Sequence, residues 1–210
     1  LCAQGSLQTV EDVLRTYAPT GRFAALRTAL IAGLSRGHSI HQMDAKNAFL
    51  NGELEEEVYL RAPAGLTVPP GHCLKLKKAI YGLRQAPRVW YTALRKFFKS
   101  IDFLPSPADP CLFVSNVSSW ECFVHVYVDD MVIISPDVNR FKALISNRFK
   151  MDDIGELKHL LGVKVDRLNA NQIYLSQEAY LIKILSDHNL LDARTAAVPM
   201  TPNTQLVRST

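Results

Sequence analysis

Cysteine is scarce in this 210-residue sequence. The four cysteines, at positions 2, 73, 111 and 122, are spaced too widely and irregularly for a zinc ribbon, and they are too few for a small disulfide-built secreted domain. We therefore expect reduced thiols in an intracellular protein. The six histidines are scattered as well, so they predict no metal site.

Long hydrophobic runs are also missing. No stretch approaches the roughly 18 apolar residues that indicate a transmembrane helix, so we expect no membrane partner. The N-terminus, residues 1–5, has no starter methionine and no basic segment leading into an apolar one, and it resembles no secretory signal. We expect a piece of a longer protein, with residues 1–210 folded as one globular domain.

Acidic residues are absent from residues 75–99, which contain eight of the basic residues, whereas the net charge of the whole chain is only +4. Aromatic residues interleave with the basic ones, an arrangement that suits a surface tracking a phosphate backbone. The alternative is a solvated helix face above a buried stripe, because the spacing of one helix face is found at Trp90, Leu94, Phe97, Phe98 and Ile101. Charge alone leaves both interpretations open.

Helical and strand patterns alternate along the chain, which favours a mixed α and β fold. Helical spacing predicts helices over residues 21–36 and from Pro87 to about residue 101, since proline fits the first helical turn. Strands are predicted at residues 39–44, 58–60, 112–117 and 121–128. A loop rich in proline and glycine follows residue 62.

Two apolar runs flank a pair of aspartates within residues 123–134, which predicts a β-hairpin whose turn holds Asp129 and Asp130. Adjacent like charges repel, and a divalent cation such as Mg²⁺ would offset that repulsion. An ordinary solvated turn is the alternative. A third carboxylate, Asp44, ends an earlier predicted strand, and three aspartates from adjacent strands would supply ligands for two metal ions.

Ordered motifs then reveal a family resemblance. They are residues 42–52 (QMDAKNAFLNG), 76–91 (LKKAIYGLRQAPRVWY), 108–110 (ADP), 112–114 (LFV), 127–130 (YVDD), 161–163 (LGV), 175–178 (LSQE) and 198–200 (VPM). Their order and separation resemble the reverse transcriptase region of copia-type retrotransposon polyproteins over nearly the whole chain. The resemblance implies an α+β polymerase palm with an antiparallel sheet, flanking helices and partial fingers.

The resemblance also implies a chemistry. A primer 3′-hydroxyl would attack the α-phosphorus of a deoxynucleoside triphosphate (dNTP), with two Mg²⁺ ions, or Mn²⁺, held by Asp44, Asp129, Asp130 and the backbone carbonyl of Ala45. The three aspartates are the implied catalytic residues, with Asp130 in a supporting role. The sheet would present Asp44 beside Asp129 and Asp130, with helices on its other face and fingers elements near residues 1–36 and 53–85.

Other matched positions imply contacts with substrates. Phe49 resembles the aromatic side chain that excludes a ribose 2′-hydroxyl, although a core phenylalanine is the alternative. Gln85 resembles a glutamine that contacts the incoming nucleotide. Nucleic-acid contacts are implied at Lys77, Lys78, Arg84, Arg88, Leu161 and Gly162, the last two resembling a turn that grips the primer.

The expected partners are an RNA template, a nucleic-acid primer, dNTPs and the rest of the polyprotein, in a cytoplasmic virus-like particle or the nucleus. The chain also departs from the pattern. Ser6 stands where the family has an aromatic residue, and the N-terminal fingers residues, the thumb or connection and the ribonuclease H domain are missing from the matched region. These departures keep a second hypothesis open, an inactive relic that retains the fold and nucleic-acid binding. A nucleotide cyclase is a weaker third, disfavoured by the Gln85 and primer-turn matches.

Overall fold

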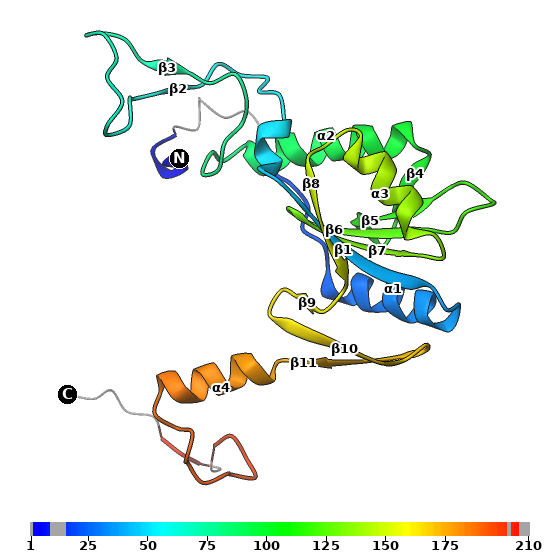
Figure 1. Ribbon diagram of the computed structural model, residues 1–210. Coiled ribbons are helices and arrows are strands. Elements are labelled where there is room, and N and C mark those ends of the chain that lie inside the picture. Colours follow the sequence, from blue (N-terminus) through cyan, green and yellow to red (C-terminus); the bar gives the residue numbers. More distant parts are fainter. Residues whose placement is uncertain (1, 9–15, 201–202, 206–210) are drawn as a thin grey trace.

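An antiparallel sheet of six strands forms the centre of the molecule, in the order β4-β5-β6-β7-β1-β8 (Figure 1). The computed structural model describes residues 2–8, 16–200 and 203–205. The strands of this sheet are β1 (Ser39–Ala45), β4 (Phe103–Ser106), β5 (Asp109–Ser115), β6 (Phe123–Tyr127), β7 (Asp130–Ser135) and β8 (Met151–Glu156). The mixed α+β class and the antiparallel sheet are therefore confirmed.

Both faces of the sheet are covered by helices, and the strand β7 contributes apolar side chains to the core on each face. Met131 and Ile133 belong to the core shared with α2 (Ala86–Ser100) and α3 (Val138–Ser146). Val132 and Ile134 belong to a second core, shared with α1 (Phe23–Ser35) on the opposite face. A strand covered on both faces has no polar alternation, which explains the continuous apolar run that the sequence shows there.

The helix α2 carries the aromatic stripe of the basic segment into the core. Trp90, Leu94, Phe97 and Phe98 are all buried, and the rings of Phe98 and Phe113 stack with centroids 3.9 Å apart. The stripe is therefore a core element. The basic residues around it remain at least partly exposed, which fits the solvated face above a buried stripe, and contact of these residues with nucleic acid stays a prediction.

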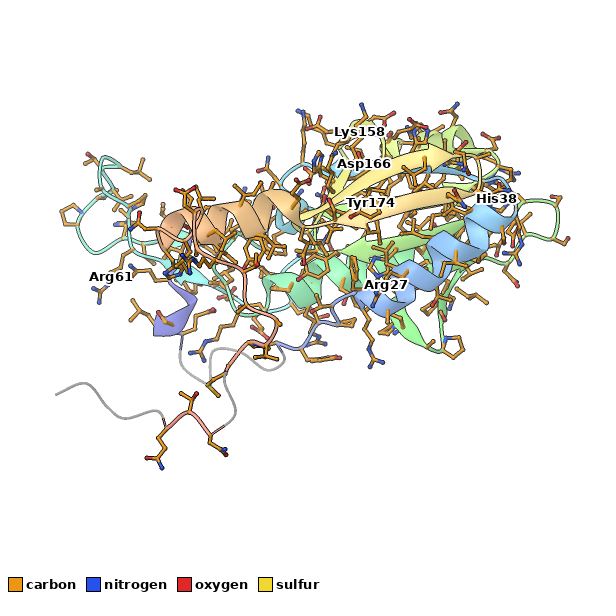
Figure 2. All side chains as sticks on the ribbon, turned by 90° about the horizontal axis from the view of Figure 1, so that it is seen from below. Arg27, His38, Arg61, Lys158, Asp166 and Tyr174 are labelled. Carbon is orange, nitrogen blue, oxygen red and sulfur yellow. The ribbon has the colours of Figure 1, made fainter. Side chains whose placement is uncertain are left out.

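Smaller elements extend from the sheet. One group comprises η1 (Gly5–Leu7), η2 (Ala48–Asn51), β2 (Tyr59–Leu60) and β3 (Leu74–Lys75), and the other comprises β9 (His159–Leu160), β10 (Val163–Asn169), β11 (Gln172–Ser176) and α4 (Glu178–Asp187). In Figure 1, β2–β3 and α4 project from the same side of the sheet, one above and one below. Viewed from below, α1 with Arg27 runs beside β10 and β11 with Asp166 and Tyr174 (Figure 2).

Two expectations about the helices were wrong. Helices lie on both faces of the sheet and not on one, because β1 and β7 present apolar residues in both directions. Residues 23–35 also do not join a fingers unit, since α1 packs Leu26, Leu30 and Leu34 against the sheet. None of the helices within residues 2–8, 16–200 and 203–205 is both long and apolar enough to cross a bilayer.

Candidate active site

The pairing of β1 with β7 brings the three aspartates of the sequence analysis together. Asp44 and Asp130 are directly opposite each other in the register of the two strands. Asp129 precedes β7, and its carbonyl oxygen accepts a hydrogen bond from the Ala45 N–H at 2.9 Å. Because partners across an antiparallel pair have Cβ atoms roughly 4.5–5.5 Å apart, three carboxylates share one end of the sheet.

A two-residue turn joins β6 to β7 and presents Asp129. Val128, the first residue of the turn, has φ = +56°, a conformation that is uncommon for a β-branched residue and common at functional sites. The indole N–H of Trp90 donates to the Val128 carbonyl at 2.8 Å. Trp90 itself is buried, so the core holds the turn in this strained conformation.

Hydrogen bonds restrain two of the three carboxylates. The Tyr81 hydroxyl donates to Oδ2 of Asp129 at 2.6 Å, and Nε2 of Gln42 donates to Oδ1 of Asp130 at 2.9 Å. The other oxygen of Asp129, Oδ1, is buried and has no hydrogen-bond partner among the residues that the structure describes. Asp44 receives no hydrogen bond from the described residues, which leaves it and one Asp129 oxygen without donors.

The electrostatics of the cluster oppose its own ionisation. Burial raises the pKa of Asp44 above its usual value, and repulsion from Asp130, Asp129 and Asp152 raises it further. Burial also raises the pKa of Asp129, with a contribution from Asp130, although the hydrogen bond from Tyr81 acts in the opposite direction. A site that gathers carboxylates at this cost in solvation is one that a cation would stabilise.

The residues present fit divalent cations. A buried acceptor with no donor, Oδ1 of Asp129, is otherwise costly, and hard cations prefer carboxylate oxygens. The carboxylates do not form a complete ligand set as they stand. Among the described residues, no three His, Cys, Asp or Glu side chains lie close enough together to hold a metal ion.

Phe49 packs against Tyr81, which is hydrogen-bonded to Asp129. It lies in η2, is only 7% exposed, and has its ring centroid 4.4 Å from that of Tyr81. Phe49 is therefore a core residue that is also one ring away from the Asp129 carboxylate. Both interpretations of Phe49 are compatible with this position, and its role in sugar selection stays a prediction.

Gln85 lies apart from the carboxylates. It precedes α2 and is 3% exposed. Its Oε1 accepts a hydrogen bond from Nε2 of Gln8 at 3.2 Å, and its Nε2 donates one to Oε2 of Glu56 at 3.3 Å. It lines a cavity of about 390 Å³ together with Arg88, Lys96 and Arg148, and none of the three aspartates lines that cavity. A nucleotide contact by Gln85 stays a prediction, and it would require these hydrogen bonds to change.

The predicted nucleic-acid contacts fall on two separate elements. Lys77 and Lys78 are exposed after β3, and Arg84 is exposed before α2, where its backbone N–H donates to Oε1 of Gln8 at 2.9 Å. Leu161 and Gly162 form the exposed turn between β9 and β10.

Three residues at the site were missed from the sequence. Tyr81 and Gln42 bind the carboxylates, and Asp152 is the register partner of Asp44 on β8, with its Oδ1 2.6 Å from Nζ of Lys46. Tyr81 and Gln42 lie inside the family motifs, which is the only signal that could have singled them out. Asp152 lies in none of the motifs, and only the β1–β8 pairing reveals it.

Comparisons with known proteins agree with the motifs. A family model described as reverse transcriptase (RNA-dependent DNA polymerase) matches residues 1–202. The chain is 34% identical over 202 residues to the retrovirus-related Pol polyprotein from transposon TNT 1-94 of Nicotiana tabacum, covering 93% of this chain and 15% of that protein. It is also 34% identical over 200 residues to the corresponding polyprotein from transposon RE1 of Arabidopsis thaliana, covering 93% of this chain and 14% of that protein.

A shorter relative shows the same likeness at lower identity. The putative transposon Ty5-1 protein of Saccharomyces cerevisiae is 27% identical over 173 residues, covering 80% of this chain and 56% of that protein. The chain spans about one seventh of the two plant polyproteins, so their other regions have no counterpart in it. With a family model matching nearly its whole length, the chain belongs to the reverse transcriptase (RNA-dependent DNA polymerase) family.

Proposed function

We propose that this chain carries the metal-dependent nucleotidyl-transfer site of a retrotransposon RNA-directed DNA polymerase. One observation carries the proposal: Asp44 and Asp130 are register partners on β1 and β7, and the Asp129 carbonyl is bonded to the Ala45 N–H. Three carboxylates at one end of a buried sheet are the ligand set that two-metal phosphoryl transfer uses. The family membership of the chain supports the same chemistry.

Each residue has a distinct task in this proposal. Asp44 and Asp129 would hold the cations, because each has an oxygen to which no described residue donates a hydrogen bond. Asp130, whose Oδ1 is bound by Gln42, would contribute charge in a supporting role, and the Ala45 carbonyl would be a further ligand. When bound, Mg²⁺ or Mn²⁺ supplies the Lewis acidity that lowers the pKa of a primer 3′-hydroxyl and neutralises the leaving pyrophosphate.

Substrate contacts follow from the same arrangement. We propose that Phe49 excludes a ribose 2′-hydroxyl and that the exposed basic residues of 75–99 contact template or primer phosphates. The template would be RNA, the primer a nucleic acid, and the substrates dNTPs. The polymerisation reaction would take place within the polyprotein, in a cytoplasmic virus-like particle.

Primer extension on a homopolymeric RNA template with Mg²⁺ or Mn²⁺ tests the proposal. The chain and a version extended at both ends are compared, each with Asp129→Asn and with the control Asp137→Asn. Asp137 accepts a hydrogen bond from the Arg140 N–H at the start of α3, and asparagine caps helices equally well. Extension that disappears only with Asp129→Asn is expected. Nucleic-acid binding without extension in the longer version would favour the relic hypothesis.

A further inference from the structure

Tyr81 contacts two residues of the proposed site, Asp129 and Phe49. Its hydroxyl donates to Oδ2 of Asp129 at 2.6 Å. Its ring lies against Phe49, with centroids 4.4 Å apart and planes inclined by 55°. One side chain therefore touches both the proposed metal ligand and the side chain proposed to select the sugar.

The main chain fixes where Tyr81 stands. Its carbonyl oxygen accepts a hydrogen bond from the Ala3 N–H at 2.7 Å. The next residue, Gly82, has φ = +92°, and a Cβ there would lie 1.9 Å from the Ala3 carbonyl oxygen. No residue other than glycine fits so close an approach. The main chain of Ala3 thus fixes the backbone at Tyr81 and Gly82, which limits the directions that the Tyr81 hydroxyl can take.

The hydrogen bond leaves Asp129 with two unlike oxygens. Oδ2 accepts a hydrogen bond from the Tyr81 hydroxyl, whereas Oδ1 is buried and has no partner within residues 2–8, 16–200 and 203–205. Partners of this kind fix the rotation of a ligating carboxylate, and their loss costs about 10–100-fold in metal affinity in known metal sites. Without the hydroxyl, Asp129 would be free to rotate toward solvent and away from Asp44.

We propose that Tyr81 is a positioning residue with two separable roles, which rests on the proposed function. Its hydroxyl orients Asp129 so that Oδ1 faces the cation, and its ring supports Phe49 from behind so that the Phe49 ring resists a 2′-hydroxyl. One side chain then serves both metal binding and sugar selection, and removal of its hydroxyl affects only metal binding.

Two substitutions separate the roles. Tyr81→Phe removes the hydroxyl and keeps the ring, whereas Tyr81→Leu removes both. The control is Tyr91→Phe, which removes a hydroxyl that donates to the Pro110 carbonyl at 2.9 Å, away from the aspartates. Binding of Mn²⁺ is measured on the free chain by the electron paramagnetic resonance signal of unbound Mn²⁺, and ribonucleotide against deoxynucleotide incorporation is measured by primer extension.

Tyr81→Phe is expected to weaken Mn²⁺ binding about 10-fold, with the preference for deoxynucleotides unchanged. Tyr81→Leu is expected to weaken Mn²⁺ binding equally and to increase ribonucleotide incorporation, and Tyr91→Phe is expected to change neither quantity. Unchanged or tighter Mn²⁺ binding by Tyr81→Phe would overturn the orienting role, because tighter binding means that the hydroxyl competes with the cation. Unchanged sugar preference in a folded Tyr81→Leu would overturn the supporting role.

The failure of this proposal is distinguishable from the failure of the metal site itself. Asp129→Asn is measured in the same Mn²⁺ titration. If Asp129→Asn leaves Mn²⁺ binding unchanged, the proposed site is wrong and the role of Tyr81 falls with it. If Asp129→Asn abolishes binding and Tyr81→Phe does not alter it, the site stands and only the role of Tyr81 is refuted.

Discussion

Among the hairpins with two-residue turns, β6–β7 and β9–β10 each place a bulky residue at positive φ. Val128, between β6 and β7, has φ = +56°, and Leu161, between β9 and β10, has φ = +51°. Their side chains are similarly exposed, at 39% and 41%. The turns differ in what lies behind them. Trp90 and Ala45 donate hydrogen bonds to the main chain of the first turn, whereas Leu161 is followed by Gly162 at φ = +78° in an exposed loop.

The difference shows two ways of maintaining an unfavourable backbone conformation. In the second turn one of the two residues at positive φ is Gly162, which accepts this conformation without strain, so Leu161 alone carries a conformational cost. In the first turn neither residue is glycine, and the strain of Val128 persists because the surrounding core fixes it. Strain held by tertiary contacts is typical of positions where a side chain, in this case Asp129, must point in a defined direction.

The largest expected effect comes from breaking the anchor of the first turn. Trp90→Phe removes the donor to the Val128 carbonyl and leaves a gap beside Phe149, whose ring centroid lies 5.1 Å from that of Trp90. We expect a loss of about 2–3 kcal/mol in the free energy of unfolding. Urea denaturation measures it. A loss under about 0.5 kcal/mol, the range of ordinary surface changes, would show that the turn does not depend on Trp90.

Divalent cations should stabilise the folded protein through the aspartates beside the first turn and not through the second turn. At ten times its dissociation constant, Mg²⁺ should add about 1.4 kcal/mol to the free energy of unfolding, and removal with a chelator should reverse the gain. Asp129→Asn should abolish it, and Leu161→Gly should not. Thermal unfolding with and without Mg²⁺ checks this, and an equal gain in Asp129→Asn would place the cation elsewhere.

A smaller effect is expected from relieving the carboxylate cluster. Because the pKa of Asp44 is raised above its ordinary value of 3.8, the folded protein holds a proton over a pH range in which the unfolded chain has lost it. The contribution of Asp44 to stability is therefore greatest below pH 3.8 and is lost as the pH rises through the raised pKa. In the absence of metal, Asp44→Asn should raise Tm by a few degrees at pH 7.

The pH dependence is the check on that prediction. The difference in Tm between Asp44→Asn and the unchanged protein should shrink toward zero as the pH falls below the ordinary pKa, where Asp44 is protonated in both folded and unfolded states. Scanning calorimetry at several pH values measures the difference. A lower Tm for Asp44→Asn at pH 7 would contradict the prediction, because it would mean that the charged form stabilises the fold.

The smallest effect is expected at the second turn. Leu161→Gly removes the cost of positive φ, about 1–2 kcal/mol, and adds the entropy cost of glycine, about 0.5–1 kcal/mol. A net gain of about 0.5 kcal/mol in the free energy of unfolding is expected. Val128→Gly makes the same change in the first turn. If both substitutions raised the free energy of unfolding equally and Val128→Gly kept its polymerase activity, the hydrogen bonds that anchor the first turn would not be needed for function.

Several parts of this architecture were predictable from the sequence. The apolar runs around Asp129 and Asp130 predicted the β6–β7 hairpin, and helical spacing predicted α1 and α2. These signals are local, since they depend on the periodicity of neighbouring residues. The predicted strand at residues 112–117 begins earlier, as β5 at Asp109, because pairing with β4 extends it. The strands β8 to β11 gave no pattern strong enough to predict.

The sequence by itself determined the family, the three aspartates and the hairpin that presents two of them. The tertiary structure decided what surrounds them: the insertion of β1 between β7 and β8, which sets Asp44 between Asp130 and Asp152, and the hydrogen bonds that reach Asp129 from Tyr81 and Asp130 from Gln42. Those bonds join residues 48 and 88 positions apart. Contacts at such separations depend on how the whole chain packs, and no local propensity records them.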